Sequence, residues 1–262
     1  GEPKLMLSVL PFLPQTSGDS LTKCLSSIAG NLPMFGFVPS DYTTNFRRPL
    51  VIFNGEAYPE SCAIAMMSGN VNPRFFSESV PENKILRRKA IVTESDENCL
   101  RKINGAPASE FMEAHGMIRD GNIWGAKVIP FIIDFNDGTP WTVRVLNIIT
   151  PDGFLILGGE AKENSTIELC AVESDDIVNT ASYLADAVSA GNYDFLIIAS
   201  CVTRNFILEL DNGAEIAIFR SRLGGRLPFL FLYTGGEICP VVYDGESCLN
   251  RFHNLTLTCC AL

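Results

Sequence analysis

The chain alternates between short apolar runs and stretches in which apolar residues recur at helical spacing. An apolar run at 5–10 is followed by an amphipathic stretch at 19–29 and by a second apolar run at 32–38. Short apolar runs bounded by turn residues predict strands, and recurrence every three to four residues predicts a helix. Asn54-Gly55 is a strong signal for a two-residue turn, so a hairpin leading into a strand at 62–67 should follow.

The same order of elements returns in the last quarter of the chain. A strand pattern at 195–200, a helix pattern at 214–223 and a strand pattern at 227–233 repeat the first unit. Residues 243–246 predict a turn toward the last strand, at 255–260. Self-similarity over so long a separation is typical of two related half-molecules and not of a short-period solenoid. The pattern therefore predicts an internal repeat.

Strand patterns dominate the region between the two copies. Apolar segments at 127–135 and 141–149 predict a hairpin. Glycines interrupt the periodicity at 116–122, so we place the domain boundary there and divide the chain into 1–122 and 123–262. The whole pattern predicts a mixed α/β (α+β) fold of two related units with mixed or antiparallel sheets flanked by helices. The irregular alternation of strands and helices disfavours a barrel.

The two copies differ in what precedes them. The second follows a strand pattern at 166–172 and the strongest helix pattern in the chain, at 174–190, for which Ser174 is the expected cap. The first has no room for an equivalent pair, because the chain opens on Gly1 inside that unit. We therefore expect the natural protein to begin earlier and its first domain to be truncated here.

Composition narrows the class of protein. The chain has 262 residues, of which 47% are apolar and 19% charged, which is typical of a globular protein and excludes disorder, collagen and coiled coils. The net charge of −10 opposes binding to nucleic acid and to anionic membranes. No apolar run approaches the roughly 18 to 20 residues of a membrane-spanning helix. We expect neither nucleic-acid binding nor membrane insertion.

Cysteine, histidine and glycine patterns bear on compartment and cofactors. The nine cysteines lie mostly in apolar or strand-like segments, which indicates reduced thiols and a cytoplasmic protein. There is no Cys-x-x-Cys and there are only two histidines, so we expect no metal site. The pair Gly158-Gly159 lacks dinucleotide or P-loop spacing and is interpreted as a turn, and no cofactor is expected.

Polar side chains stand at the ends of predicted strands in the second half, where open α/β sheets collect groups that face a ligand. We expect these side chains to converge on one pocket. The candidate ligand-binding residues are Arg144, Cys201, Arg204, Tyr233, Gly235, Glu237, His253 and Asn254.

These residue types suit a small zwitterion. The planar guanidinium of Arg204 can bind a carboxylate through two parallel hydrogen bonds, while Glu237 and Asn254 could meet an amino group. An amino-acid-like ligand or another small polar metabolite is therefore expected. The alternative is that Arg204 and Glu237 pair with each other inside the protein, because buried charges need partners.

Two other classes of function remain open. Cys201 lies near a basic residue and could act as a nucleophile with His253 as its base, as in a Cys-dependent hydrolase or transferase. No nucleophile-elbow motif surrounds Cys201, so we interpret the protein as non-enzymatic and assign no catalytic residue. A scaffold that only binds other proteins is the third hypothesis.

Motifs in the second half resemble the C-terminal domain of the FIST family. They occur in the family's order at 141–144, 200–204, 233–238 and 252–258. The resemblance runs from about residue 123 to the end of the chain. Further upstream, 33–41, 53–55 and 91–108 are similar to the later part of the FIST N-terminal domain, whose early part is missing.

The resemblance implies a sensor of intracellular signal transduction, mainly bacterial, that binds a small ligand such as an amino acid and is not known as a catalytic fold. It points to the same candidate residues. Gly235-Gly236 and Thr203 depart from the family's pattern, which bears on the shape of the pocket. No kinase, cyclase or DNA-binding segment is evident, so the output requires a signalling partner such as a histidine kinase or a cyclase-type module.

Overall fold

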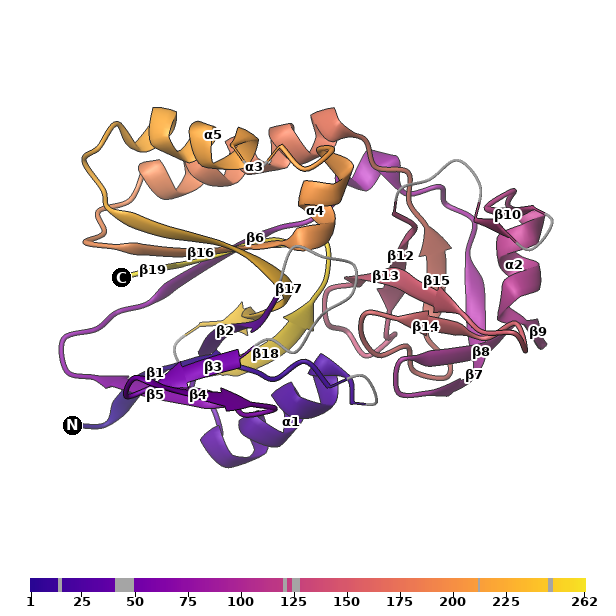
Figure 1. Ribbon diagram of the computed structural model, residues 1–262, viewed down its shortest axis with the longest axis horizontal. Coiled ribbons are helices and arrows are strands. Elements are labelled where there is room, and N and C mark those ends of the chain that lie inside the picture. The colour runs from indigo at the N-terminus through magenta and orange to yellow at the C-terminus, as the bar shows by residue number, and fades with distance from the viewer. Residues whose placement is uncertain (14–15, 41–49, 120–121, 124–127, 212, 245–246) are drawn as a thin grey trace.

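The computed structural model describes residues 1–13, 16–40, 50–119, 122–123, 128–211, 213–244 and 247–262 (Figure 1). The described residues form a large open sheet, a second sheet beside it, and helices on the outer faces of both. The predicted mixed α+β fold with flanking helices is confirmed. Two short antiparallel strand pairs lie outside these sheets. In the first, β3 (Leu50–Phe53) pairs with β4 (Glu56–Pro59), and in the second, β10 (Ile118–Arg119) pairs with β11 (Asn122–Ile123).

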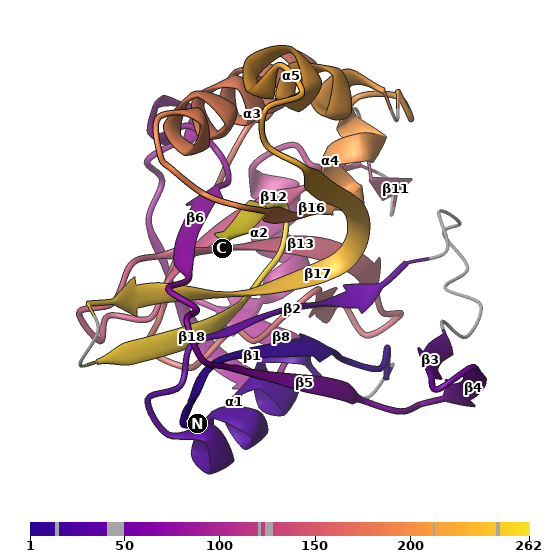
Figure 2. The same ribbon diagram turned by 90° about the vertical axis from the view of Figure 1, so that its left-hand side faces the viewer.

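The large sheet draws its strands from both ends of the chain (Figure 2). Among the described residues it has eight strands, seven of them on one continuous path and one, β18, paired with β17 alone. The path runs β5 (Ala63–Ser68), β1 (Pro3–Val9), β2 (Met34–Pro39), β17 (Phe229–Tyr243), β16 (Leu196–Cys201), β19 (Leu257–Ala261) and β6 (Arg74–Glu78), with β18 at Cys248–His253.

The predicted repeat is visible in this strand order. In the first copy β1 pairs parallel with β2 and antiparallel with β5. In the second copy β16 pairs parallel with β17 and antiparallel with β19. The two copies meet where β2 and β17 pair antiparallel, so the sheet has the same order when it is traced outward from this junction in either direction.

Strand β17 pairs with strands of both copies. Its first part, from Phe229 to Thr234, pairs with β16, and its later residues pair with β2 and with β18. The change of partner falls at Gly235-Gly236, where the register with β2 shifts. One continuous strand therefore joins the two halves of the large sheet.

Three helices lie on the side of β16 and β19, namely α3 (Ser174–Ser189), α4 (Val202–Ile207) and α5 (Ala214–Leu223) (Figure 1). The apolar stripe of α3 packs with Phe219 of α5 onto Leu196 and Ile198 of β16. The predicted helix at 174–190 is confirmed, but its cap is Glu173 and not Ser174. The Glu173 side chain accepts from the third residue of the helix while Asp176 accepts from the backbone of Glu173, which forms a capping box.

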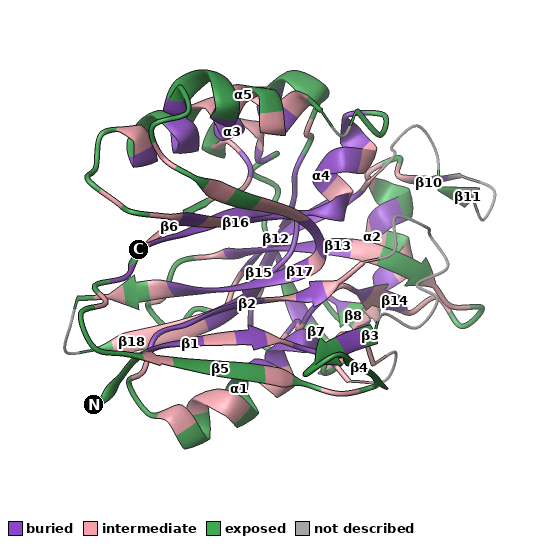
Figure 3. Ribbon diagram, turned by 60° about the vertical axis from the view of Figure 1, so that its left-hand side comes forward, coloured by how far each residue is buried: buried purple, intermediate pink, exposed green. Residues whose placement is uncertain are grey.

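Helix α1 (Gly18–Ala29) lies on the side of the sheet away from α3 and α5 (Figure 1). Its residues Leu21 and Leu25 pack against Met34 and Phe252. The side chain of Ser17 accepts a hydrogen bond from the backbone N–H of Ser20 and caps the helix. The outer surfaces of α1 and α5 and the edge strand β5 are largely exposed, whereas the centre of the sheet is buried (Figure 3).

The second sheet closes on itself, which corrects the expectation that no barrel is present. Its closing pair is β8 with β14, in which Leu100 and Cys99 lie opposite Leu155 and Ile156. This contact joins segments that are far apart in the chain, so local periodicity could not reveal it. The strand order is β14 (Leu155–Leu157), β13 (Thr142–Ile149), β12 (Pro130–Asp134), β15 (Thr166–Leu169), β7 (Ala90–Asp96), β8 (Cys99–Ile103) and β9 (Ala106–Pro107).

The interior of this closed sheet holds its own core, with Val92, Phe131, Ile133 and Leu157 fully or almost fully buried and α2 (Ala108–Ala114) packed against it. Both sheets contain strands from before and after residue 122, so the sheets do not divide the chain at the predicted domain boundary. Part of that boundary region, and Gly245-Glu246 of the predicted 243–246 turn, lie outside the described residues. No described helix is long and apolar enough to span a membrane.

Candidate functional site

A cavity of about 390 Å³ lies where the large sheet meets the closed sheet. Its walls come from the segment before α1, from β2, β17, β18 and α4 on one side, and from β13 and β14 on the other. The described lining residues are Pro11, Phe12, Leu13, Thr16, Ser17, Gly18, Val38, Asn98, Val128, Val145, Leu146, Asn147, Ile148, Ile156, Leu157, Gly158, Cys201, Val202, Thr203, Phe206, Gly235, Phe252 and Asn254. The shape of the cavity thus depends on how the two sheets are placed against each other.

The cavity gathers three of the eight candidate residues, namely Cys201 at the end of β16, Gly235 within β17 and Asn254 just after β18. A second hollow, of about 550 Å³, is lined by His253 together with Glu78, Thr142 and Thr256. The other four candidates line neither hollow. The structure therefore brings part of the predicted set together and distributes the rest around it.

Asn254 is almost completely buried in the cavity wall. Its Oδ1 atom accepts no hydrogen bond from the described residues. Gly158 lies against it, because a Cβ atom at that position would be 2.7 Å from Asn254 Oδ1. A side chain at Gly158 would displace the Asn254 amide, so the glycine is required here for close approach and not only for a turn.

Cys201 is a neutral thiol in the wall of the cavity. Burial, followed by the nearby Glu237 carboxyl, raises the pKa of Cys201 to about 12. Its Sγ lies 2.9 Å from the hydroxyl of Thr203. Burial also raises the pKa of Glu237 well above the ordinary value, although its Oε1 accepts a 2.6 Å hydrogen bond from Thr234 Oγ1. A thiol with so high a pKa is a poor nucleophile at neutral pH.

His253 is not joined to Cys201 by any hydrogen bond among the described residues. Its Nε2 lies 3.1 Å from the carbonyl oxygen of Cys239. Burial lowers the pKa of His253 to about 4, and the positive charges of Arg144 and Arg251 contribute to the same direction. The arrangement of base and nucleophile that the Cys-dependent alternative requires is therefore not formed.

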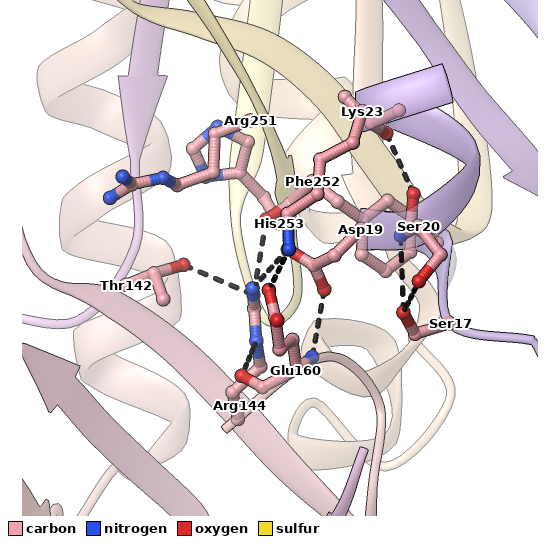
Figure 4. Close-up of polar contacts among 12 residues, drawn as sticks. Ser17, Asp19, Ser20, Lys23, Thr142, Arg144, Glu160, Arg251, Phe252 and His253 are labelled. Carbon is pink, nitrogen blue, oxygen red and sulfur yellow. Dashed lines mark hydrogen bonds and ion pairs between the residues drawn. The ribbon is translucent and has the colours of Figure 1, made fainter. Parts of the chain in front are cut away.

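Arg144, on β13, is fully buried and binds Asp19, the second residue of α1 (Figure 4). Its Nη2 is 2.6 Å from Asp19 Oδ1, its Nε donates to the carbonyl of Glu160, and its Nη1 donates to the carbonyl of Phe252. The other oxygen of Asp19 accepts from the backbone N–H of Glu160 at 2.8 Å. This ion pair ties the closed sheet to α1 and β18 next to the cavity.

Gly159 makes that ion pair possible. A Cβ atom there would be 2.6 Å from Asp19 Oδ2 and 2.7 Å from Arg144 Nε. The pair Gly158-Gly159, which the sequence presented as an ordinary turn, therefore gives room to two polar groups at the junction of the sheets. The glycine pair is visible in the sequence, but the side chains that it makes room for, on Asp19, Arg144 and Asn254, cannot be identified from sequence spacing.

Arg204, on α4, is also fully buried and pairs with Glu215 of α5. Its Nε and Nη2 donate to Glu215 Oε1 at 3.0 and 2.8 Å, and Ser200 Oγ donates to Oε2 at 2.8 Å. The hypothesis of an internal pair is correct for Arg204, but the partner is Glu215 and not Glu237. The guanidinium also donates to Thr180 and to the carbonyl of Ile177 in α3.

Tyr233 is buried in β17 with its ring packed edge-on against Phe231 at a centroid distance of 5.3 Å. Among the described residues, no group of three His, Cys, Asp or Glu side chains is placed to hold a metal ion. The arrangement supplies a walled space with neutral hydrogen-bonding groups, and Arg144 and Arg204 are paired with Asp19 and Glu215.

Two protein-family models match the chain. The FIST N domain matches residues 3–106 and the FIST C domain matches residues 98–240. The chain belongs to the FIST family. FIST domains are associated with sensing in signal transduction. No curated protein sequence matches the chain at a significant level. In this FIST protein, the cavity takes residues from both matched segments, Phe12 from the first and Cys201 from the second among them.

Proposed function

We propose that this FIST protein is the ligand-binding module of a signalling system and that a small molecule binds in the cavity between its two sheets. The observation that carries the proposal is that one cavity is walled by both sheets and by both family segments. A ligand in that position contacts β14 on one side and β17 on the other. Its binding energy therefore depends on the relative placement of the two sheets.

Such dependence is what a sensor requires. A ligand shifts a conformational equilibrium only by the difference between its affinities for the two states. A molecule that fills the cavity would favour the arrangement in which Ile156 of the closed sheet and Gly235 of the large sheet are correctly spaced. We propose that a partner protein, such as a histidine kinase or a cyclase-type module, responds to this arrangement.

An amino acid or another small polar metabolite is the ligand class that the family resemblance favours. Hydroxyl and amide groups in the wall, such as Thr203 and Asn254, could bind its polar atoms. The cytoplasm is the compartment we propose, because all nine cysteines are free thiols and reduced thiols persist there. Cysteine-dependent catalysis is not proposed, since the pKa of Cys201 is raised to about 12.

A thermal-shift screen tests the proposal. The protein is heated with a panel of amino acids, sugars, nucleosides and neutral aromatic metabolites, and Tm is recorded. A ligand that binds only the folded state raises Tm, by an amount that grows with its concentration over Kd. The same panel is run on Ile156→Trp, which enlarges a cavity-lining side chain, and on the control Ile91→Trp, at an exposed strand position outside the cavity.

We expect at least one compound to raise Tm in the natural protein and in Ile91→Trp but not in Ile156→Trp. If no compound shifts Tm, or if Ile156→Trp responds as strongly as the natural protein, the cavity is not the sensory site.

A further inference from the structure

The cavity wall contains no charged side chain among its described residues. Its apolar part includes Phe12, Val145, Ile156, Phe206 and Phe252. Its polar part consists of neutral hydroxyl, amide and thiol groups. Those polar side chains belong to Thr16, Ser17, Asn98, Asn147, Cys201, Thr203 and Asn254.

The two fully buried arginines, Arg144 and Arg204, are already neutralised by internal partners. Arg144 is paired with Asp19, and Arg204 is paired with Glu215. Each guanidinium also donates to backbone carbonyls, so its hydrogen-bonding capacity is largely used within the protein. A charged ligand would lose hydration in the cavity without gaining an opposite charge, which is strongly unfavourable.

Several of the polar groups in the wall are also occupied. Ser17 Oγ accepts from the backbone N–H of Ser20, and Asn98 Nδ2 donates to the carbonyl of Leu157. Thr203 Oγ1 lies within hydrogen-bonding distance of Cys201 Sγ. Asn254 differs from them, because its buried Oδ1 has no donor among the described residues. A buried acceptor without a donor is costly, and a ligand N–H or O–H would remove that cost.

We infer that the cavity takes an uncharged, mainly apolar molecule that donates one hydrogen bond to Asn254 Oδ1, after a rotation of that side-chain amide turns the oxygen away from Gly158 and toward the cavity. This inference rests on the proposed function, because it requires the cavity to be the ligand site, and it names a ligand class that differs from the amino acid favoured by the family resemblance. It replaces the zwitterion that the candidate arginine and glutamate residues suggested. Those charged groups stabilise the walls, while the interior of the cavity selects against charge.

Two matched fluorescent probes test the charge requirement. N-phenyl-1-naphthylamine is neutral, aromatic and carries one N–H, whereas 8-anilino-1-naphthalenesulfonate has the same framework with a sulfonate added. Both are titrated into the natural protein, Ile156→Trp and Ile91→Trp, and Kd is measured from the rise in fluorescence. We expect the neutral probe to bind at least about tenfold more tightly than the sulfonate, because an unpaired charge resists burial. Ile156→Trp should abolish this binding and Ile91→Trp should preserve it.

A second comparison tests the hydrogen bond. The compound 1-benzylnaphthalene replaces the N–H of the neutral probe by a methylene group, and its affinity is measured by displacement of Nile red. The natural protein should prefer the N–H compound by about tenfold, since only that compound supplies a donor to a buried acceptor. In Asn254→Leu the preference should disappear. The comparison in the natural protein decides the point even if Asn254→Leu does not fold.

The outcomes separate the two claims. If the sulfonate binds as tightly as the neutral probe and Ile156→Trp removes that binding, the cavity is a ligand site but the inferred ligand class is wrong. If every probe binds equally well to Ile156→Trp, the proposed function itself is wrong. Equal affinity for the N–H and methylene compounds would overturn the role of Asn254.

Discussion

The two fully buried arginines, Arg144 and Arg204, serve different parts of the molecule. Arg204 and Glu215 both belong to the second copy of the repeat, and their pair fastens α4 and α5 beneath α3. Arg144 and Asp19 come from opposite sides of the junction, and their pair fastens the closed sheet to α1. A buried arginine–carboxylate pair thus holds three helices together at Arg204, whereas at Arg144 it fixes the contact between the closed sheet and α1. Only the second case bears directly on the shape of the cavity.

The largest effect is expected from Arg204→Ala. Removing the guanidinium leaves Glu215 completely buried without its cation, which should lower the free energy of unfolding by about 4 kcal/mol. Chemical denaturation measures the loss. Arg222→Ala, which breaks an exposed pair with Asp186, is the matched control and should change stability little. A stable Arg204→Ala protein that had lost only probe binding would instead place Arg204 in the ligand site.

A smaller loss, of about 3 kcal/mol, is expected from Arg144→Ala. Asp19 keeps the hydrogen bond from the backbone N–H of Glu160 and lies in the first turn of α1, where the helix dipole favours a negative charge. Because the pair spans the junction, this variant should also weaken binding of N-phenyl-1-naphthylamine at temperatures where it remains folded. Unchanged probe affinity would show that the junction does not depend on the pair.

The pH dependence of stability sharpens the comparison, because His253 lies beside Arg144. The pKa of His253 is lowered from 6.5 to about 4, mainly by burial. Below about pH 6.5 the unfolded chain takes up a proton that the folded protein refuses, so stability falls as the pH drops toward 4. The contribution should be about 2 kcal/mol between pH 8 and pH 5.

Unfolding curves of His253→Gln test this expectation, since the glutamine side chain does not titrate. The difference between the natural protein and His253→Gln isolates the histidine from other groups that titrate in the same range. If the free energy of unfolding varied with pH in the same way for the natural protein and His253→Gln, His253 would have the same pKa in the folded and unfolded states, and the expectation would be wrong.

Local patterns predicted the repeat because each copy is built from neighbouring segments. Apolar runs, an amphipathic helix and the Asn54-Gly55 turn are all local signals, and the turn adopts the expected left-handed backbone at both residues. The closed sheet was missed because its closure joins Leu100 to Leu155. The sequence contains no periodic signal for a contact between segments so far apart.

The candidate site was predicted in part for the same reason. Cys201 at the end of β16 and Asn254 just after β18 do meet in one cavity, and Gly235 joins them although it lies within β17 and not at its end. Arg144 and Arg204 were predicted to bind a ligand because the sequence does not reveal which carboxylates they pair with inside the protein. Asp19 lies 125 residues before Arg144, and Glu215 lies on the helix after Arg204 in a position that spacing alone does not distinguish. Side-chain chemistry identified which groups matter, and the fold decided which of them face one another.

The change of partner within β17 has a mechanical consequence. Gly235 touches the cavity at the point where this strand leaves β16 and joins β2. Its chain neighbours are both paired, since Thr234 lies opposite Cys201 and Pro39 and Gly236 lies opposite Val38. A molecule bound against Gly235 would therefore act on a single strand whose hydrogen-bonded partners belong to both copies of the repeat.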